Sequence, residues 1–185
     1  MQRVCFSHSE TVFYVWVALG AVTVLWVGWN LTLDAMWQPT DRSTVRRILF
    51  LSGIREGESL VDLGCGDGRI AVAAAREFGA YATGIEIDPI RALWGKAWIL
   101  LAGLSGRARV ICGNMYTAEL SGADVVILFL SAKANLRLQD RLRRELKPGA
   151  RVVSYYHPVW GWRPDEIGET KAGHQIYLYR IPEDG

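Results

Sequence analysis

The sequence predicts an α/β protein with a parallel sheet, closed by a C-terminal antiparallel hairpin and preceded by one membrane-spanning helix. Three observations support this prediction. From Ser59 onward, short apolar runs alternate with helix-forming segments, which is typical of a parallel sheet covered on both faces. A glycine-rich loop follows the first of these runs. Near the N-terminus, the 22 residues 12–33 carry no charge.

The uncharged stretch 12–33 is the first element. As a helix it would be about 33 Å long at ~1.5 Å per residue, which matches the ~30 Å core of a bilayer. Aromatic residues flank it, as in interfacial belts. A cleaved signal peptide and a buried soluble helix are the alternatives, but 34–37 (DAMW) is a poor cleavage site. We therefore expect a membrane anchor within 1–36 and a separate domain at 37–185.

The remaining elements alternate along the chain. An amphipathic helix is expected at 40–51, before the first strand. The other helices are expected at 69–78, 89–103 and 133–147. Strands are expected at 59–63, 81–87, 108–112, 124–130, 151–157 and 174–181. The last of these pairs with 165–171 across Ala172-Gly173 as an antiparallel hairpin.

Composition excludes some classes of function. The formal net charge is +2, too slight to indicate a nucleic-acid partner. The three cysteines, Cys5, Cys65 and Cys112, are scattered and lack the spacing of metal ligands. We interpret them as reduced thiols and expect no metal site.

The glycine loop is the most specific feature. Residues 61–69 read VDLGCGDGR, so Asp62 precedes three alternating glycines. Such a loop lets the backbone approach a ligand closely, and the following helix directs its N-terminal amides at the same place. A dinucleotide fingerprint needs G-x-G-x-x-G. Arg69 stands where its third glycine would be, which disfavours a nicotinamide-dependent reductase.

A second carboxylate ends the next predicted strand. Glu86 lies 22 residues after Gly64, one strand–helix–strand repeat, so the two strand ends should lie side by side. A carboxylate there can accept hydrogen bonds from ribose hydroxyls. Asp88-Pro89 then begins the next helix, with Asp88 as the cap.

The D-x-G-x-G-x-G pattern together with Glu86 resembles the class I S-adenosylmethionine-dependent methyltransferases, which have a Rossmann-like sheet. The resemblance implies that Asp62 helps to hold the amino-acid end of the cofactor and that Glu86 binds the ribose. It also implies that the loop passes beneath the sugar and the sulfonium. The loop residues concerned are Gly64, Cys65, Gly66, Asp67 and Gly68.

The resemblance extends to the adenine. Asn114 stands where the family commonly has an acidic residue that accepts from the adenine amino group, and an amide oxygen can also accept. Ile87 and Met115 are candidate partners for the adenine faces. After the fourth strand, the Asn/Asp-Pro-Pro-Tyr/Phe motif of amino-group methyltransferases of nucleic acids and glutamine is missing. Those substrates are therefore disfavoured.

One branch of the class is matched over roughly residues 37–181. The segments WQPT, VDLGCGDGRI, GIEID and RLRRELKPGARVVSYYHPVWGW resemble small membrane-anchored protein-lysine methyltransferases. The mitochondrial members modify the ATP synthase c-subunit and the adenine nucleotide translocase, and archaeal relatives methylate many proteins. The resemblance implies a protein substrate that can itself be a membrane protein. The domain should face the cytoplasm, where the cofactor is made and where the arginines after the anchor are favoured.

The segment after the fifth strand is rich in aromatic residues, which attract a cationic amine. We name Tyr155, His157 and Trp160 as catalytic candidates, with His157 as the base. These side chains could instead pack the edge of the sheet. The alternative functions are methylation of a quinone or lipid and a non-catalytic, cofactor-binding scaffold.

Overall fold

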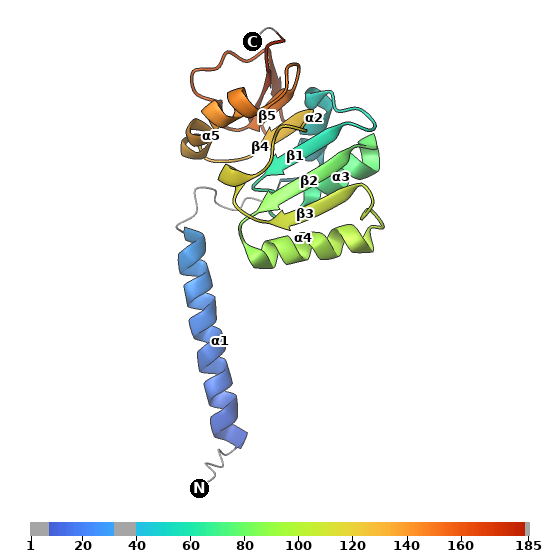
Figure 1. Cartoon of the computed structure of the whole chain (residues 1–185). Coiled ribbons are helices and arrows are strands. Elements are labelled where there is room, and N and C mark those ends of the chain that lie inside the picture. The colour runs from blue at the N-terminus through green and yellow to red at the C-terminus, as the bar shows by residue number, and fades with distance from the viewer. Residues whose placement is uncertain (1–7, 32–39, 184–185) are drawn as a thin grey trace.

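The computed structural model describes residues 8–31 and 40–183 (Figure 1). Its helices are α1 (His8–Leu31), α2 (Arg42–Ser52), α3 (Arg69–Phe78), α4 (Pro89–Leu101) and α5 (Ala132–Glu145), with a 3₁₀ turn η1 at Met115–Thr117. Its strands are β1 (Ser59–Leu63), β2 (Tyr81–Glu86), β3 (Ala108–Cys112), β4 (Val125–Leu128), β5 (Arg151–Tyr155), β6 (Glu166–Glu169) and β7 (Gln175–Arg180).

The seven strands form one sheet in the order β3-β2-β1-β4-β5-β7-β6. Strands β1 to β5 run parallel, and β7 is antiparallel to both β5 and β6. The predicted parallel sheet with a closing hairpin is therefore confirmed. The C-terminal ends of β1, β2, β4 and β5 lie along one edge of this sheet, where α/β folds bind their ligands.

Several predicted elements are shorter in the structure. The strand expected at 124–130 ends at Leu128, and the strand expected at 151–157 ends at Tyr155. The second prediction was wrong because Tyr156 has φ +74°, a left-handed conformation that a strand does not allow. The helix expected at 89–103 ends at Leu101, and Gly103 follows with φ +68°.

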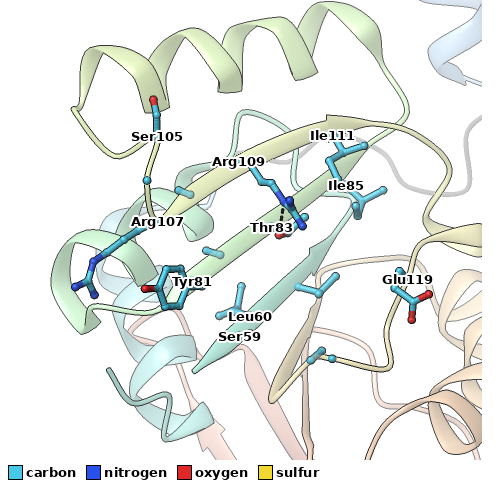
Figure 2. Close-up of a pocket in the computed structure, with 16 residues that line it drawn as sticks. Ser59, Leu60, Tyr81, Thr83, Ile85, Ser105, Arg107, Arg109, Ile111 and Glu119 are labelled. Atoms are coloured by element: carbon cyan, nitrogen blue, oxygen red, sulfur yellow. Dashed lines mark hydrogen bonds between the residues drawn. The ribbon is translucent and has the colours of Figure 1, made fainter. Parts of the chain in front are cut away.

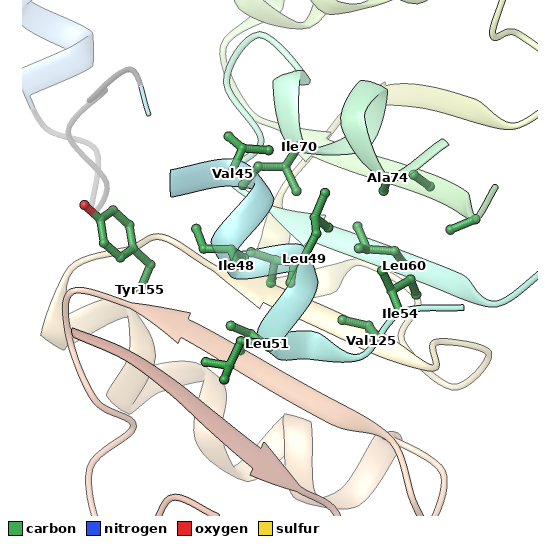
Figure 3. Packing of buried hydrophobic residues seen from close by; sticks show 14 of the residues in the cluster. Val45, Ile48, Leu49, Leu51, Ile54, Leu60, Ile70, Ala74, Val125 and Tyr155 are labelled. Carbon is green, nitrogen blue, oxygen red and sulfur yellow. The ribbon is translucent and has the colours of Figure 1, made fainter. Parts of the chain in front are cut away.

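One face of the sheet is covered by α2, α3 and α4. The Asp41 carboxylate caps α2 by accepting from the backbone N–H groups of Ser43 and Thr44. This cap sets α2 so that Ile48 and Leu49 are fully buried against α3 and the strands (Figure 3). Burying each of these side chains contributes about 1.5–3 kcal/mol.

The opposite face is covered only in part. Helix α5 packs Ala134, Leu138 and Leu142 onto it, as their four-residue spacing predicts, and all three are fully buried. The chain passes from β3 to β4 through η1, so the face over β1, β2 and β3 holds a cavity of about 470 Å³ (Figure 2). Arg109 crosses this cavity and donates from Nε to Thr83 Oγ1 at 3.1 Å.

Helix α1 stands apart from the sheet (Figure 1). Its apolar window, Glu10–Gly28, is long enough to cross a membrane, and none of it is buried within the structure. The alternative of a buried soluble helix is therefore wrong. The predicted boundary between residues 36 and 37 lies outside the described residues and stays a prediction.

Candidate functional site

The glycine loop joins β1 to α3 at the C-terminal edge of the sheet. Gly64, Gly66 and Gly68 have φ of +77°, +57° and +76°, values that favour glycine. The N–H groups of Gly64 and Cys65 both donate to the carbonyl of Ile85, at 2.9 and 3.0 Å. A Cβ on Gly64 would lie 2.8 Å from Leu130 Cδ2. The loop is thus tied to β2 by backbone bonds, and α3 begins immediately after Gly68.

Glu86 fixes this loop from the end of β2. Its Oε2 accepts from the N–H of Gly66 at 2.8 Å, and its Oε1 accepts from the N–H of Asp88 at 2.9 Å. The side chain is 5% exposed. A carboxylate has about four acceptor positions, so both oxygens keep capacity for the hydroxyls of a ribose.

Asp62 is a deeply buried carboxylate at the end of β1. Among the described residues, its Oδ2 is fully buried and has no hydrogen-bond partner. Burial, and then the charges of Glu86 and Asp67, raises the pKa of Asp62 to about 7. Burying an unpaired carboxylate costs free energy. The position of Asp62 therefore fits a site that is completed by a ligand with cationic groups, such as the ammonium and sulfonium groups of S-adenosylmethionine.

The side chain of Cys65 packs into the core between α3 and β2. It packs beside Val72 and Ala75, against the backbone of Gly84, where a Cβ would lie 2.5 Å from its Sγ. Burial raises the pKa of the Cys65 thiol, so this thiol is an unreactive packing group. Any contact of Cys65 with the cofactor would come from its backbone.

Asp67 is engaged by Arg69 through both carboxylate oxygens. The Nη1 of Arg69 also donates to the carbonyl of Thr40, which immediately precedes the cap of α2. Arg69 therefore links the glycine loop to the start of the domain. The sequence singled out Arg69 only as a missing glycine, and its bridging role was not predicted.

The predicted adenine residues lie at the ends of β2 and β3, which are neighbouring strands. Asn114 Oδ1 accepts from the N–H of Tyr116 at 2.9 Å and caps η1. Ile87 is exposed, whereas Met115 is half-buried against the α5 side of the core. Their assignment to the adenine stays a prediction.

The acceptor loop, residues 156–165, follows β5 along the same edge. Two of the candidates lie in it: His157 is half-buried and Trp160 is 75% exposed. The third, Tyr155, is buried against Phe129, and its hydroxyl lies 3.1 Å from His174 Nδ1. Tyr155 is thus mainly a packing residue, while the neighbouring Tyr156 is half-exposed.

Tyr156 and Asn135 are further features of the acceptor loop that the sequence did not reveal. Tyr156 is held at φ +74°, and strained backbone of this kind concentrates at functional sites. The buried Asn135 donates from Nδ2 to the carbonyl of His157 and to Ser154 Oγ, each at 3.0 Å. No sequence spacing signals either feature, because Asn135 reaches the loop from α5 and the N–H of Tyr156 donates to the carbonyl of Gln175 on β7.

The cavity over β1, β2 and β3 is separate from this arrangement. Its lining includes Tyr81, Thr83, Arg107 and Ile111 (Figure 2), but neither the glycine loop nor Glu86. The glycine loop, the paired carboxylates and the parallel sheet closed by a hairpin define a class I S-adenosylmethionine-dependent methyltransferase.

Similarity to known proteins agrees with this class and narrows it. Residues 62–166 match the ANTKMT methyltransferase domain. A protein-lysine N-methyltransferase of Saccharolobus islandicus (strain REY15A) is 40% identical over 149 residues, 78% of this chain and 92% of that protein. The chain therefore belongs to the ANTKMT family of S-adenosylmethionine-dependent methyltransferases, whose members include protein-lysine N-methyltransferases.

Two other relatives differ in what they act on. The human lysine N-methyltransferase of the ATP synthase c-subunit is 31% identical over 129 residues, and the match spans 70% of this chain but only 54% of that protein. A solved RNA methyltransferase from Salinibacter ruber, in complex with S-adenosyl-L-homocysteine, is 36% identical with a TM-score of 0.77. That match covers 80% of this chain and 96% of the solved one. The predicted class and cofactor are thus confirmed.

Proposed function

We propose that this chain methylates lysine side chains of proteins from a position on a membrane, where α1 anchors it. The observation that carries the proposal is the 40% identity across 92% of a protein-lysine N-methyltransferase. The apolar, unburied α1 supports the anchor. The cytoplasmic supply of cofactor supports a domain that faces the cytoplasm.

The binding half of the mechanism uses the carboxylates described above. S-adenosylmethionine supplies a methyl group made electrophilic by its sulfonium centre. Glu86 would hold the ribose while keeping Gly66 in place, and Asp62 would accept from the ammonium group at the amino-acid end. The bare backbone of Gly64–Gly68 leaves room for close approach, so the chain contributes mainly position and orientation.

The accepting half needs a neutral lysine amine, because only the deprotonated nitrogen has a lone pair for attack. An apolar, aromatic surrounding lowers the pKa of a lysine by removing water from the charged form. The exposed rings of Tyr156 and Trp160 provide such a surface in the acceptor loop. His157, in the same loop, is the candidate that takes the proton from the amine.

Transfer of a labelled methyl group into a membrane extract tests the proposal. The full chain is incubated with the extract, and the label is sorted among protein, lipid and RNA. We expect it in protein, as methyl-lysine on mass spectrometry. Label in a quinone or lipid would establish the small-molecule alternative, and label in RNA would give this chain the activity of its Salinibacter relative.

Two variants control this experiment. Glu86→Ala should abolish transfer, because it removes the ribose acceptor. Glu166→Ala removes an exposed carboxylate on β6 and should transfer normally. Equal incorporation with both variants would show that the label comes from other enzymes in the extract.

A further inference from the structure

Helix α4 has two apolar faces, and only one of them packs on the sheet. Ala92, Gly95 and Ile99 are buried against β3 and its neighbours. Five large apolar side chains on the other side are exposed by more than half: Ile90 (58%), Leu93 (68%), Trp94 (67%), Leu100 (69%) and Leu101 (87%). A solvated helix would place polar residues on that side.

These exposed residues form one continuous stripe. With about 100° of rotation per residue, positions 90, 93, 94, 97, 100 and 101 fall within about 120° of one another. The stripe lies opposite the buried positions 92, 95 and 99. We name these six exposed positions the outer stripe of α4. Exposed apolar stripes of this size indicate a site of interaction.

The outer stripe is bordered by basic residues. On the same projection, Arg91 falls on one side of the stripe and Lys96 on the other. Trp98, which is half-buried, lies beside Arg91. Long basic side chains and tryptophan rings favour the boundary between lipid and water, where the apolar part is buried and the polar end stays wet. The stripe therefore matches the chemistry of a bilayer surface.

The position of α1 relates this stripe to a membrane. Trp26, near the end of the apolar window, donates from Nε1 to Asp88 Oδ2 at 2.9 Å. Asp88 is the N-cap of α4. In Figure 1, α4 forms the side of the domain from which α1 extends, and it runs across the direction of α1. A bilayer crossed by α1 would thus have its surface at the level of α4.

We propose that the outer stripe of α4 inserts into the interfacial layer of the bilayer that α1 spans. The inference rests on the proposed membrane anchor and deepens the proposed function. Interfacial helices bury their apolar face by about 5–10 Å at the boundary of headgroups and acyl chains. A protein partner over the stripe is the competing occupant, and the test below separates the two.

The insertion would also orient the site. Helix α4 begins three residues after Glu86, and Gly95 lies so close to the loop that a Cβ there would be 3.1 Å from the carbonyl oxygen of Asp67. The glycine loop is thus packed directly on α4, the helix proposed to meet the lipid. In this orientation the site would reach lysine side chains that lie close to the membrane surface.

Site-specific fluorescence in vesicles tests the inference on the full chain. In a background with Cys5→Ser and Cys112→Ser, an environment-sensitive label is attached at Leu93→Cys in the stripe. Val17→Cys in α1 and Lys171→Cys in the hairpin turn are the positive and negative controls. The vesicles contain phosphatidylcholine and phosphatidylglycerol, with or without a nitroxide on the acyl chains, and iodide serves as the aqueous quencher.

We expect the label at position 93 to be quenched by the lipid nitroxide several-fold more than the label at 171, with a blue-shifted emission. Quenching at 17 but not at 93, with 93 open to iodide, would overturn the inference and leave the anchor standing. Protection of 93 from both quenchers would overturn it in favour of a second copy of this chain over the stripe. No quenching at 17 would refute the anchor, and the inference with it. Methyl transfer to soluble protein is measured separately, so that loss of the proposed activity can be told apart from failure of the stripe to insert.

Discussion

The cofactor edge and the acceptor loop lie along the same side of the sheet but are held in different ways. The cofactor edge, formed by residues 64–68 and Glu86, is fixed by backbone hydrogen bonds to Ile85 and to the Glu86 carboxylate. The acceptor loop is fixed by side chains from distant elements: Asn135 of α5 holds His157, and the Tyr179 hydroxyl accepts from the N–H of Val159. The geometry of the cofactor edge is therefore set by residues close together in the sequence. The geometry of the acceptor loop is set by contacts between elements that are far apart in the sequence.

The largest effect at the cofactor edge is expected for Glu86→Ala. It removes the ribose acceptor and leaves the N–H groups of Gly66 and Asp88 without partners, at about 1–3 kcal/mol each. We expect the affinity for S-adenosylmethionine, measured by calorimetry, to fall by about 100-fold or more. Unchanged affinity would refute the assignment of Glu86. A thermal melt of Glu166→Ala gives the baseline for losing a carboxylate elsewhere.

Gly64→Ala tests whether the loop needs close approach as well as unusual backbone angles. Gly57 is a matched control, because its φ is +80° and a Cβ there would meet nothing within 4 Å, whereas at Gly64 it would meet Leu130 at 2.8 Å. We expect Gly57→Ala to cost about 1–2 kcal/mol and Gly64→Ala a further ~1–3 kcal/mol from overpacking. Denaturant unfolding measures both, and equal costs would contradict the close approach.

The pKa of Asp62, about 7, predicts a pH dependence of cofactor binding. A cationic ligand needs the ionised carboxylate, so affinity should rise as pH increases to about 7 and level off above it, by at most about tenfold per unit. Asp62→Asn should flatten this profile in calorimetry between pH 5.5 and 7.5. A wild-type profile that is already flat would show that Asp62 does not contact the cation.

The same pKa fixes the sign of a stability effect. The ordinary pKa of an aspartate is 3.8, so between about pH 4 and 7 the folded apoprotein holds a proton that the unfolded chain has released. Its stability should therefore fall as pH rises through this window and change little above about pH 7. Urea unfolding of the apoprotein measures this trend, and Asp62→Asn should weaken it.

The smallest effect on stability is expected in the acceptor loop. Tyr156→Ala and Tyr156→Gly remove the same ring, but only glycine relieves the cost of φ +74°. We expect the glycine variant to be more stable than the alanine variant by about 1–2 kcal/mol, or a few degrees in Tm. Both should lose methyl transfer to lysine equally. Full activity of the glycine variant would show that Tyr156 is not part of the lysine-binding site.

This contrast explains what could be predicted from the sequence. Asp62, Gly64 and Glu86 lie within one strand–helix–strand repeat, so both carboxylates and their place at the ends of two neighbouring parallel strands could be predicted. Asn135 reaches the acceptor loop from α5, and the N–H of Tyr156 donates to the carbonyl of Gln175 on β7. No local sequence pattern contains contacts of this kind. For Tyr155 the sequence left two readings open, because an aromatic residue at a strand end gives the same pattern whether it faces a ligand or packs in the core, and the structure buries it against Phe129.

Arg69 connects the start of the domain to the glycine loop. Its guanidinium donates to Asp67 and to the carbonyl of Thr40 at once, and Thr40 directly precedes Asp41, the N-cap of α2. In a chain tethered as proposed, tension along the tether would reach the cofactor loop through this bridge. The thickness and strain of the surrounding lipid would then become variables of the methylation rate.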